Sequence, residues 1–108
     1  MRRNSDQWMN LLQLMFEGSD YDVMMNGGQG NSQGVAIVPK NCCGPQRICI
    51  YPKKTKGAGL VIEMDVYNLL SSKGILQEYG KLKSNRPHYG GLSDEIIIEA
   101  CSIFLENF

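Results

Sequence analysis

Four cysteines and a single histidine are the residues of this chain best suited to bind a metal ion or to act as nucleophiles. Cys42 and Cys43 are adjacent and Cys49 follows, whereas a structural zinc site uses pairs of ligands at spacings such as C-x₂-C. His88 has no second histidine to complete such a set. We therefore expect no zinc site, and we interpret Cys49 and Cys101 as small buried residues.

Acidic residues offer a different chemistry, the binding of a hard cation such as Mg²⁺. Asp20 and Asp22 form one pair, and Glu63 and Asp65 form another. A nuclease core would also need an acidic residue two positions before the lysine that ends the segment VAIVPK, and that position is Val38. We therefore expect no catalytic residues, no metal and no cofactor, and we rank an enzyme last among the functions considered.

Basic side chains are concentrated in the middle of the chain, although the formal net charge is zero. Residues 40–86 hold nine basic and three acidic side chains, residues 1–39 hold two and four, and residues 87–108 hold none and four. Such asymmetry can mark an interaction surface, or it can reflect segments that pair loosely in solvent. The candidate nucleic-acid-binding residues are Lys53, Lys54, Lys56, Lys73, Lys81, Lys83 and Arg86, with Tyr79, His88 and Tyr89 near bases or sugars.

Two functions follow from this composition and stay open at the level of sequence. The first is a small nucleic-acid-binding protein with a regulatory role. The second is a non-enzymatic protein-binding module, such as a small inhibitor, an immunity-type protein or an assembly adaptor, because zero net charge and wide apolar helices suit it. No apolar run approaches the roughly 18 residues of a membrane span, and we see no signal peptide, so we expect a cytoplasmic location without membrane contact.

A helix near the N-terminus is the first element that would position these residues. Asn4 or Ser5 can cap this helix, and Gly18 can end it. One face carries Trp8, Leu11, Leu12 and Met15, which predicts a core helix. Residues 19–34 follow as a flexible loop rich in glycine and asparagine, within which residues 21–25 can still form a short strand. This loop leads into a strand rather than a helix, so we expect no phosphate-binding loop.

Two segments rich in β-branched residues, Val35–Val38 and Arg47–Tyr51, predict strands. Gly44 and Pro45 between them signal a turn, so the two strands should form a β-hairpin. The segment Leu60–Met64 is ambiguous. Its alternation fits a third strand, whereas a helix that began near its first residue would merge with the next predicted helix.

The stretch from Asp65 to Ser93 contains the most consistent local signals. Asp65 can cap a helix, Lys73 falls in the last turn, and Gly74 with Ile75 matches a Schellman cap. Three segments then predict a strand, a basic loop and a returning strand: residues 75–79, 80–87 and 88–92.

This succession of leucines, Lys-Gly-Ile-Leu, a basic loop and Tyr-Gly-Gly-Leu-Ser resembles the second half of winged-helix domains. In that family a helix precedes a β-hairpin whose loop is the wing. The resemblance covers residues 65–93, about a quarter of the chain. A winged helix also has another helix immediately upstream, where this chain has strand-like sequence.

The C-terminal segment predicts a long helix that Ser93 caps. Its broad apolar stripe includes Ile97, Cys101, Phe104 and Phe108, which predicts deep burial or a dimer interface. An added C-terminal helix often serves dimerisation in winged-helix proteins, so the resemblance allows a homodimer through this helix. Residues 1–108 are thus predicted to form a small single α+β domain with an N-terminal helix, a short antiparallel sheet or hairpins, a central short helix and a C-terminal helix.

Overall fold

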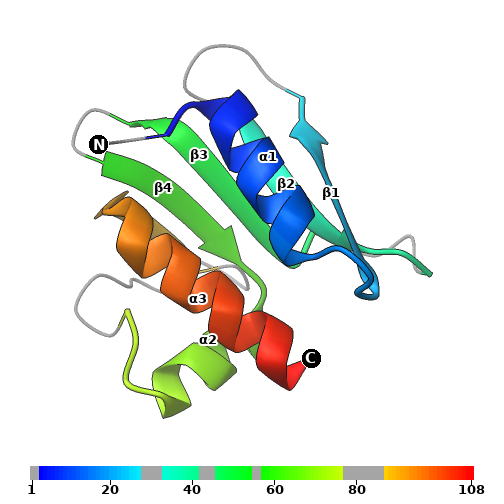
Figure 1. The fold of residues 1–108 in the computed structure, drawn as a ribbon. Coiled ribbons are helices and arrows are strands. Elements are labelled where there is room, and N and C mark those ends of the chain that lie inside the picture. Colours follow the sequence, from blue (N-terminus) through cyan, green and yellow to red (C-terminus); the bar gives the residue numbers. More distant parts are fainter. Residues whose placement is uncertain (1–2, 28–32, 42–45, 55–56, 77–86) are drawn as a thin grey trace.

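Three helices and a five-stranded antiparallel sheet form the described part of this protein, which we analyse as a computed structural model (Figure 1). The structure describes residues 3–27, 33–41, 46–54, 57–76 and 87–108, without the side chains of Lys53 and Lys54. The element order is α1 (Ser5–Met15), β1 (Tyr21–Asn26), β2 (Gly34–Pro39), β3 (Ile48–Lys54), β4 (Gly57–Ile62), α2 (Met64–Ser72), β5 (His88–Leu92) and α3 (Asp94–Asn107). The predicted α+β class is confirmed.

The sheet is a simple meander in which each strand pairs with the next one along the chain, in the order β1-β2-β3-β4-β5. Val23 lies opposite Ile37, and Ile37 lies opposite Ile48. Because side chains alternate between the two faces of a strand, this register gathers the β-branched residues on one face. Helices α1 and α3 lie across that face (Figure 1).

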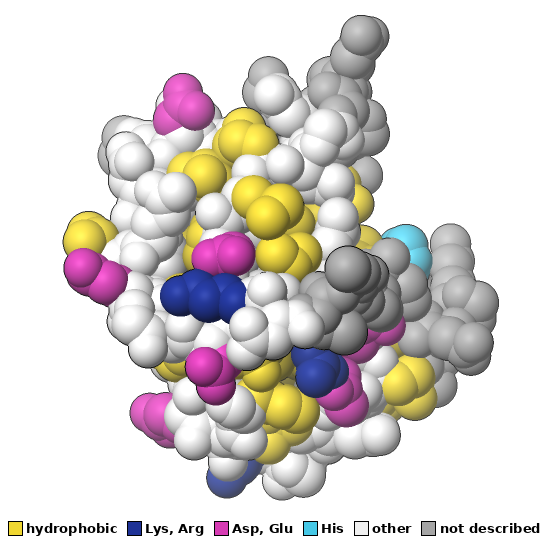
Figure 2. Space-filling view, turned by 90° about the vertical axis from the view of Figure 1, so that its right-hand side faces the viewer, with side chains coloured by type: hydrophobic (Ala, Val, Ile, Leu, Met, Phe, Trp, Pro, Cys, Tyr) yellow, Lys and Arg dark blue, Asp and Glu magenta, His cyan; other side chains and the backbone are white. Residues whose placement is uncertain are grey.

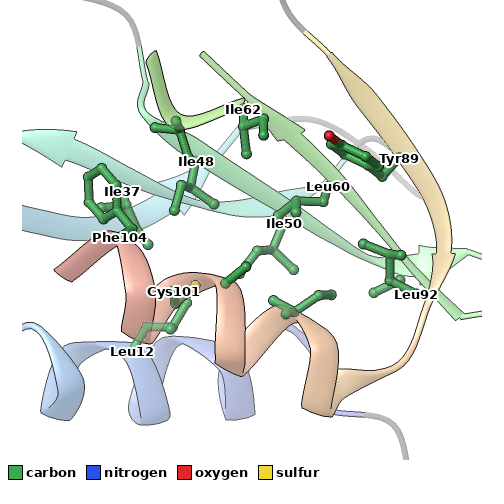
Figure 3. Close-up of a cluster of buried hydrophobic side chains, with 14 of the residues drawn as sticks. Leu12, Ile37, Ile48, Ile50, Leu60, Ile62, Tyr89, Leu92, Cys101 and Phe104 are labelled. Atoms are coloured by element: carbon green, nitrogen blue, oxygen red, sulfur yellow. The ribbon is translucent and has the colours of Figure 1, made fainter. Parts of the chain in front are cut away.

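The hydrophobic core lies between the sheet and these helices. Side chains from β2, β3, β4 and β5 point toward the helices, and those of α1 and α3 point back (Figure 3). The largest fully buried side chains are Trp8, Phe104, Leu12, Ile37, Ile48, Ile50, Leu60, Ile62, Leu70, Leu92, Ile97 and Val35. The apolar stripes predicted for the first and last helices therefore face the core, apart from Phe108, which is 43% exposed.

Helix α1 is capped by Asn4, one of the two caps that the sequence allows, and the cap is part of a capping box. The Asn4 side chain accepts from the Gln7 N–H at 2.8 Å, and the Gln7 side chain accepts from the Asn4 N–H at 2.9 Å. The helix ends at Met15, and Gly18 follows with a φ of 76°, a conformation that favours glycine. Helix α3 is capped by Ser93, whose hydroxyl accepts from the Ile96 N–H at 3.4 Å.

Helix α2 ends as predicted but starts elsewhere. Its N-cap is Glu63 rather than Asp65, because the Asp65 carboxylate instead pairs with Arg47, the residue directly before β3. The C-terminus is a Schellman motif in which Gly74 has a φ of 74° and the Ile75 N–H donates to the Leu70 carbonyl at 3.0 Å. Residues 57–62 form β4, so the ambiguity upstream of this helix is resolved in favour of a strand.

The structure agrees with some of the expectations and corrects others. Strand β1 is the short strand that the sequence allows within residues 19–34, of which residues 28–32 lie outside the described ranges. Ile75 and Leu76 are not in a strand, and residues 77–86 lie outside the described ranges. Strand β5 pairs with β4. The element directly before α2 is a strand, so the upstream helix of a winged helix does not stand there.

Candidate functional site

Most of the predicted nucleic-acid-binding residues lie outside what the structure describes. This applies to Lys56, Lys81, Lys83 and Arg86, and to the side chains of Lys53 and Lys54, whose backbone belongs to the end of β3. Lys73 is the C-cap of α2 and is exposed. Cys42 and Cys43 also lie outside the described ranges.

The described residues that flank the two lysine-rich segments lie at opposite ends of β4. Lys54 pairs with Gly57 at the first end. At the other end, the Ile62 N–H donates to the carbonyl of Pro87, the residue that follows segment 77–86. A six-residue strand spans about 17 Å at roughly 3.3 Å per residue. These two attachment points are therefore separated by about the length of β4.

Tyr89 packs in the core rather than on a ligand-binding surface. Its side chain is 6% exposed, and it lies opposite Leu60 among the buried residues (Figure 3). Burial, with a smaller contribution from Tyr67, raises the pKa of the Tyr89 hydroxyl to about 12. We predicted Tyr89 near bases or sugars, and the structure instead gives its ring a packing role.

Two ion pairs hold the ends of the chain in place. Arg47 pairs with Asp65, and its guanidinium lies 5.4 Å from the centre of the Phe108 ring. Arg3 pairs with the buried Asp94 at 3.3 Å, and its backbone N–H donates to the same carboxylate oxygen at 2.9 Å. These contacts engage both arginines in the packing of α2 and α3, so we assign them structural roles.

Catalytic and metal-binding chemistry finds little support in the side chains that the structure describes. Among them, no group of three or more histidine, cysteine or acidic side chains is placed to hold a metal ion. Cys49 and Cys101 are both buried, and burial raises the pKa of the Cys101 thiol to about 12. A thiol with such a pKa is a poor nucleophile at neutral pH. None of the described helices has the length and apolar character needed to cross a bilayer.

Strand β1 supplies a feature that sequence reasoning missed, an open sheet edge. It pairs with β2 on one side, and no described strand pairs with it on the other. The Lys40 N–H donates to the Asp20 carbonyl at 2.9 Å, which marks this pair as hydrogen-bonded across β1 and β2. Hydrogen-bonded pairs alternate in an antiparallel ladder, so the N–H and C=O groups of Tyr21, Val23 and Met25 point away from β2.

The three outward-facing positions on this edge are not equivalent. The Tyr21 N–H is locally satisfied, because it donates to the Ser19 hydroxyl oxygen at 3.2 Å, whereas that hydroxyl donates its one hydrogen to the Phe16 carbonyl at 2.7 Å. Val23 and Met25 have no comparable side-chain partner within the described ranges. These two residues therefore present two N–H groups and two C=O groups along the outer edge of β1.

Two of the exposed large apolar side chains among the described residues belong to this edge strand. Met24 and Met25 are 44% and 40% exposed, whereas Leu14 on α1 and Phe108 at the C-terminus are exposed outside β1. Figure 2, which looks onto the β1 side of the molecule, shows hydrophobic side chains gathered in the middle of this face. A thioether surface adapts readily to different partners. We call this open edge with Met24 and Met25 the β1 edge site.

Comparisons of the chain with protein-family models, with curated proteins and with solved structures found no match.

Proposed function

We propose that this chain is a non-enzymatic protein-binding module that receives an extended segment of its partner at the β1 edge site. The observation that carries this proposal is the row of outward-facing backbone groups at Val23 and Met25, next to exposed methionine side chains. An extended segment that adds to a sheet edge gains affinity from main-chain hydrogen bonds and specificity from alternate side chains. An adaptor or a small inhibitor could work in this way.

The composition of β1 supports this role. Natural proteins protect exposed edges with charged side chains, especially lysine, with proline or with a bulge. The strand YDVMMN contains neither lysine nor proline, its one charged side chain is Asp22, and its register with β2 runs without interruption from Tyr21 to Asn26. Within the described residues, an edge with so little protection and with exposed apolar side chains favours pairing with another chain.

Capture from a host extract, followed by identification of the bound proteins, tests the proposal. Met24→Lys places a charge in the middle of the β1 edge site, so a captured partner should be lost or reduced at least about tenfold, because burying an unpaired charge is costly. Leu14→Lys is the matched control, since it makes the same change at an exposed apolar residue outside β1. Equal capture by both variants and the original chain would rule out the β1 edge site.

A nucleic-acid-binding regulator remains a second candidate because the charge is unevenly distributed. Residues 40–86 carry an excess of six positive charges, and Lys73 is exposed at the end of α2. If several lysines contact phosphates, affinity for mixed-sequence duplex should fall by orders of magnitude between about 50 and 200 mM salt. No binding at the lower salt concentration would remove this candidate.

A further inference from the structure

We infer that the β1 edge site binds a second copy of this chain, with the two β1 strands antiparallel across a two-fold axis at Met24. This inference rests on the proposed function and names the partner. Two copies related in this way would join their sheets into one continuous sheet, with the same strand contributed by each molecule.

The open backbone groups of β1 are self-complementary in this register. With the axis at Met24, Val23 of one copy lies opposite Met25 of the other, and the reverse holds on the far side of the axis. Each of these two pairs exchanges both N–H···O=C bonds, because both residues direct their backbone groups outward. The pairing makes four hydrogen bonds and leaves no N–H or C=O group of Val23 or Met25 unpaired.

If the axis is moved by one residue in either direction, the outward-facing backbone groups of Val23 and Met25 no longer all find a partner. With the axis at Val23, Met25 would lie opposite Tyr21, whose N–H already donates to the Ser19 hydroxyl oxygen, so the Met25 carbonyl of each copy would stay unpaired. With the axis at Met25, Val23 would lie opposite Gly27, which is beyond the end of the strand. The axis at Met24 is therefore the arrangement that the hydrogen-bonding groups favour.

The side chains agree with the same register. Met24 meets its own symmetry mate, so two exposed apolar side chains cover each other on the outer face. Asp22 lies opposite Asn26 rather than opposite another Asp22, which avoids like-charge repulsion. The Asn26 amide nitrogen already donates to the Tyr51 hydroxyl at 3.2 Å and to the Cys49 sulfur at 3.0 Å, so it remains a fixed neutral neighbour.

The dimer should be weak and reversible. One short strand from each copy buries less surface than the roughly 1,200 Å² of a standard interface, so we expect a dissociation constant on the order of 10⁻⁴ M. A homodimer through the C-terminal helix is less favoured, because Ile97, Cys101 and Phe104 on its apolar stripe are buried within the core.

Sedimentation equilibrium of the full chain tests the inference. Concentrations from about 10 µM to 1 mM bracket the expected dissociation constant. The variants exchange the charge of the residue at the two-fold axis. Met24→Lys and Met24→Asp should each sediment as a monomer, because each places two like charges opposite one another. An equimolar mixture of the two variants should associate at least about tenfold more tightly than either alone, since opposite charges then meet. Circular dichroism establishes that both variants are folded.

Leu14→Lys and Leu14→Asp, mixed in the same way, are the controls and should dimerise like the original chain. The inference is overturned if the original chain stays monomeric at 1 mM, or if the Met24 mixture associates no better than its components. If the original chain instead captures a different protein, and Met24→Lys abolishes that capture, the proposed function is still supported. If neither association occurs, the proposed function fails as well.

Discussion

Replacing Phe104 by alanine should lower the free energy of unfolding by about 3–5 kcal/mol, the range for loss of a buried aromatic ring. Phe104 is fully buried, and the centre of its ring lies 4.9 Å from that of Tyr21 on β1 and 6.2 Å from that of Phe16 after α1. The ring thus joins α3 to the end of α1 and to the edge strand. Alanine would leave a cavity where these three elements meet.

Urea denaturation followed by circular dichroism measures this change, and Phe108→Ala is the matched control. The Phe108 ring is 43% exposed and stacks on Phe104 at 5.0 Å, so its removal should cost no more than about 1.5 kcal/mol, including its contact with Arg47. Similar losses for the two variants would show that Phe104 does not occupy the centre of the core.

Substitution of Gly34 by alanine should be the second most damaging change, with an expected loss of about 1–3 kcal/mol or more from overpacking. A Cβ atom at this position would lie 2.3 Å from the Ile50 carbonyl oxygen and 3.1 Å from the Tyr51 ring. The obstruction is backbone, which cannot rotate away as a side chain could. Strand β2 would have to move away from β3.

Thermal unfolding is a suitable measurement for this variant, since 1 kcal/mol shifts the Tm of a domain of this size by roughly 4–8 °C. Gly90→Ala is the control. It changes another strand glycine in the same way, and a Cβ atom there would meet nothing within 4 Å. We expect its effect to stay within about 0.5 kcal/mol. An unchanged Tm for Gly34→Ala would mean that β2 and β3 are not as close as described.

The sequence correctly predicted those helix ends that depend only on residues close by in the chain. The Asn4 cap of α1, the Ser93 cap of α3 and the Gly74 stop of α2 each rest on contacts within five residues, and all three are confirmed. The predicted start of α2 was wrong because the side chain of Asp65 pairs with Arg47, which lies 18 positions away in the sequence. A contact of that kind depends on the packed fold.

The candidate site was harder to predict because it depends on which strand lies at the edge of the sheet. The sequence allows a short strand within residues 21–25, but the surrounding glycines, asparagines and serines do not show where that strand lies in the sheet. Sheet order is a non-local property, so the exposure of Met24 could not be read from spacing alone. For Tyr89 the error was in the opposite direction. We expected this aromatic residue to be accessible to a ligand, and it is buried.

Amide hydrogen exchange at single-residue resolution tests most directly the central claim, that β1 is an open edge which accepts another strand. In dilute solution, the Val23 and Met25 amides should exchange at least about tenfold faster than those of Asp22 and Met24, whose N–H groups pair with β2. Raising the protein concentration should slow exchange at Val23 and Met25 and leave Asp22 and Met24 unchanged. Equal protection of all four amides in dilute solution would contradict the open edge and the functions proposed for it.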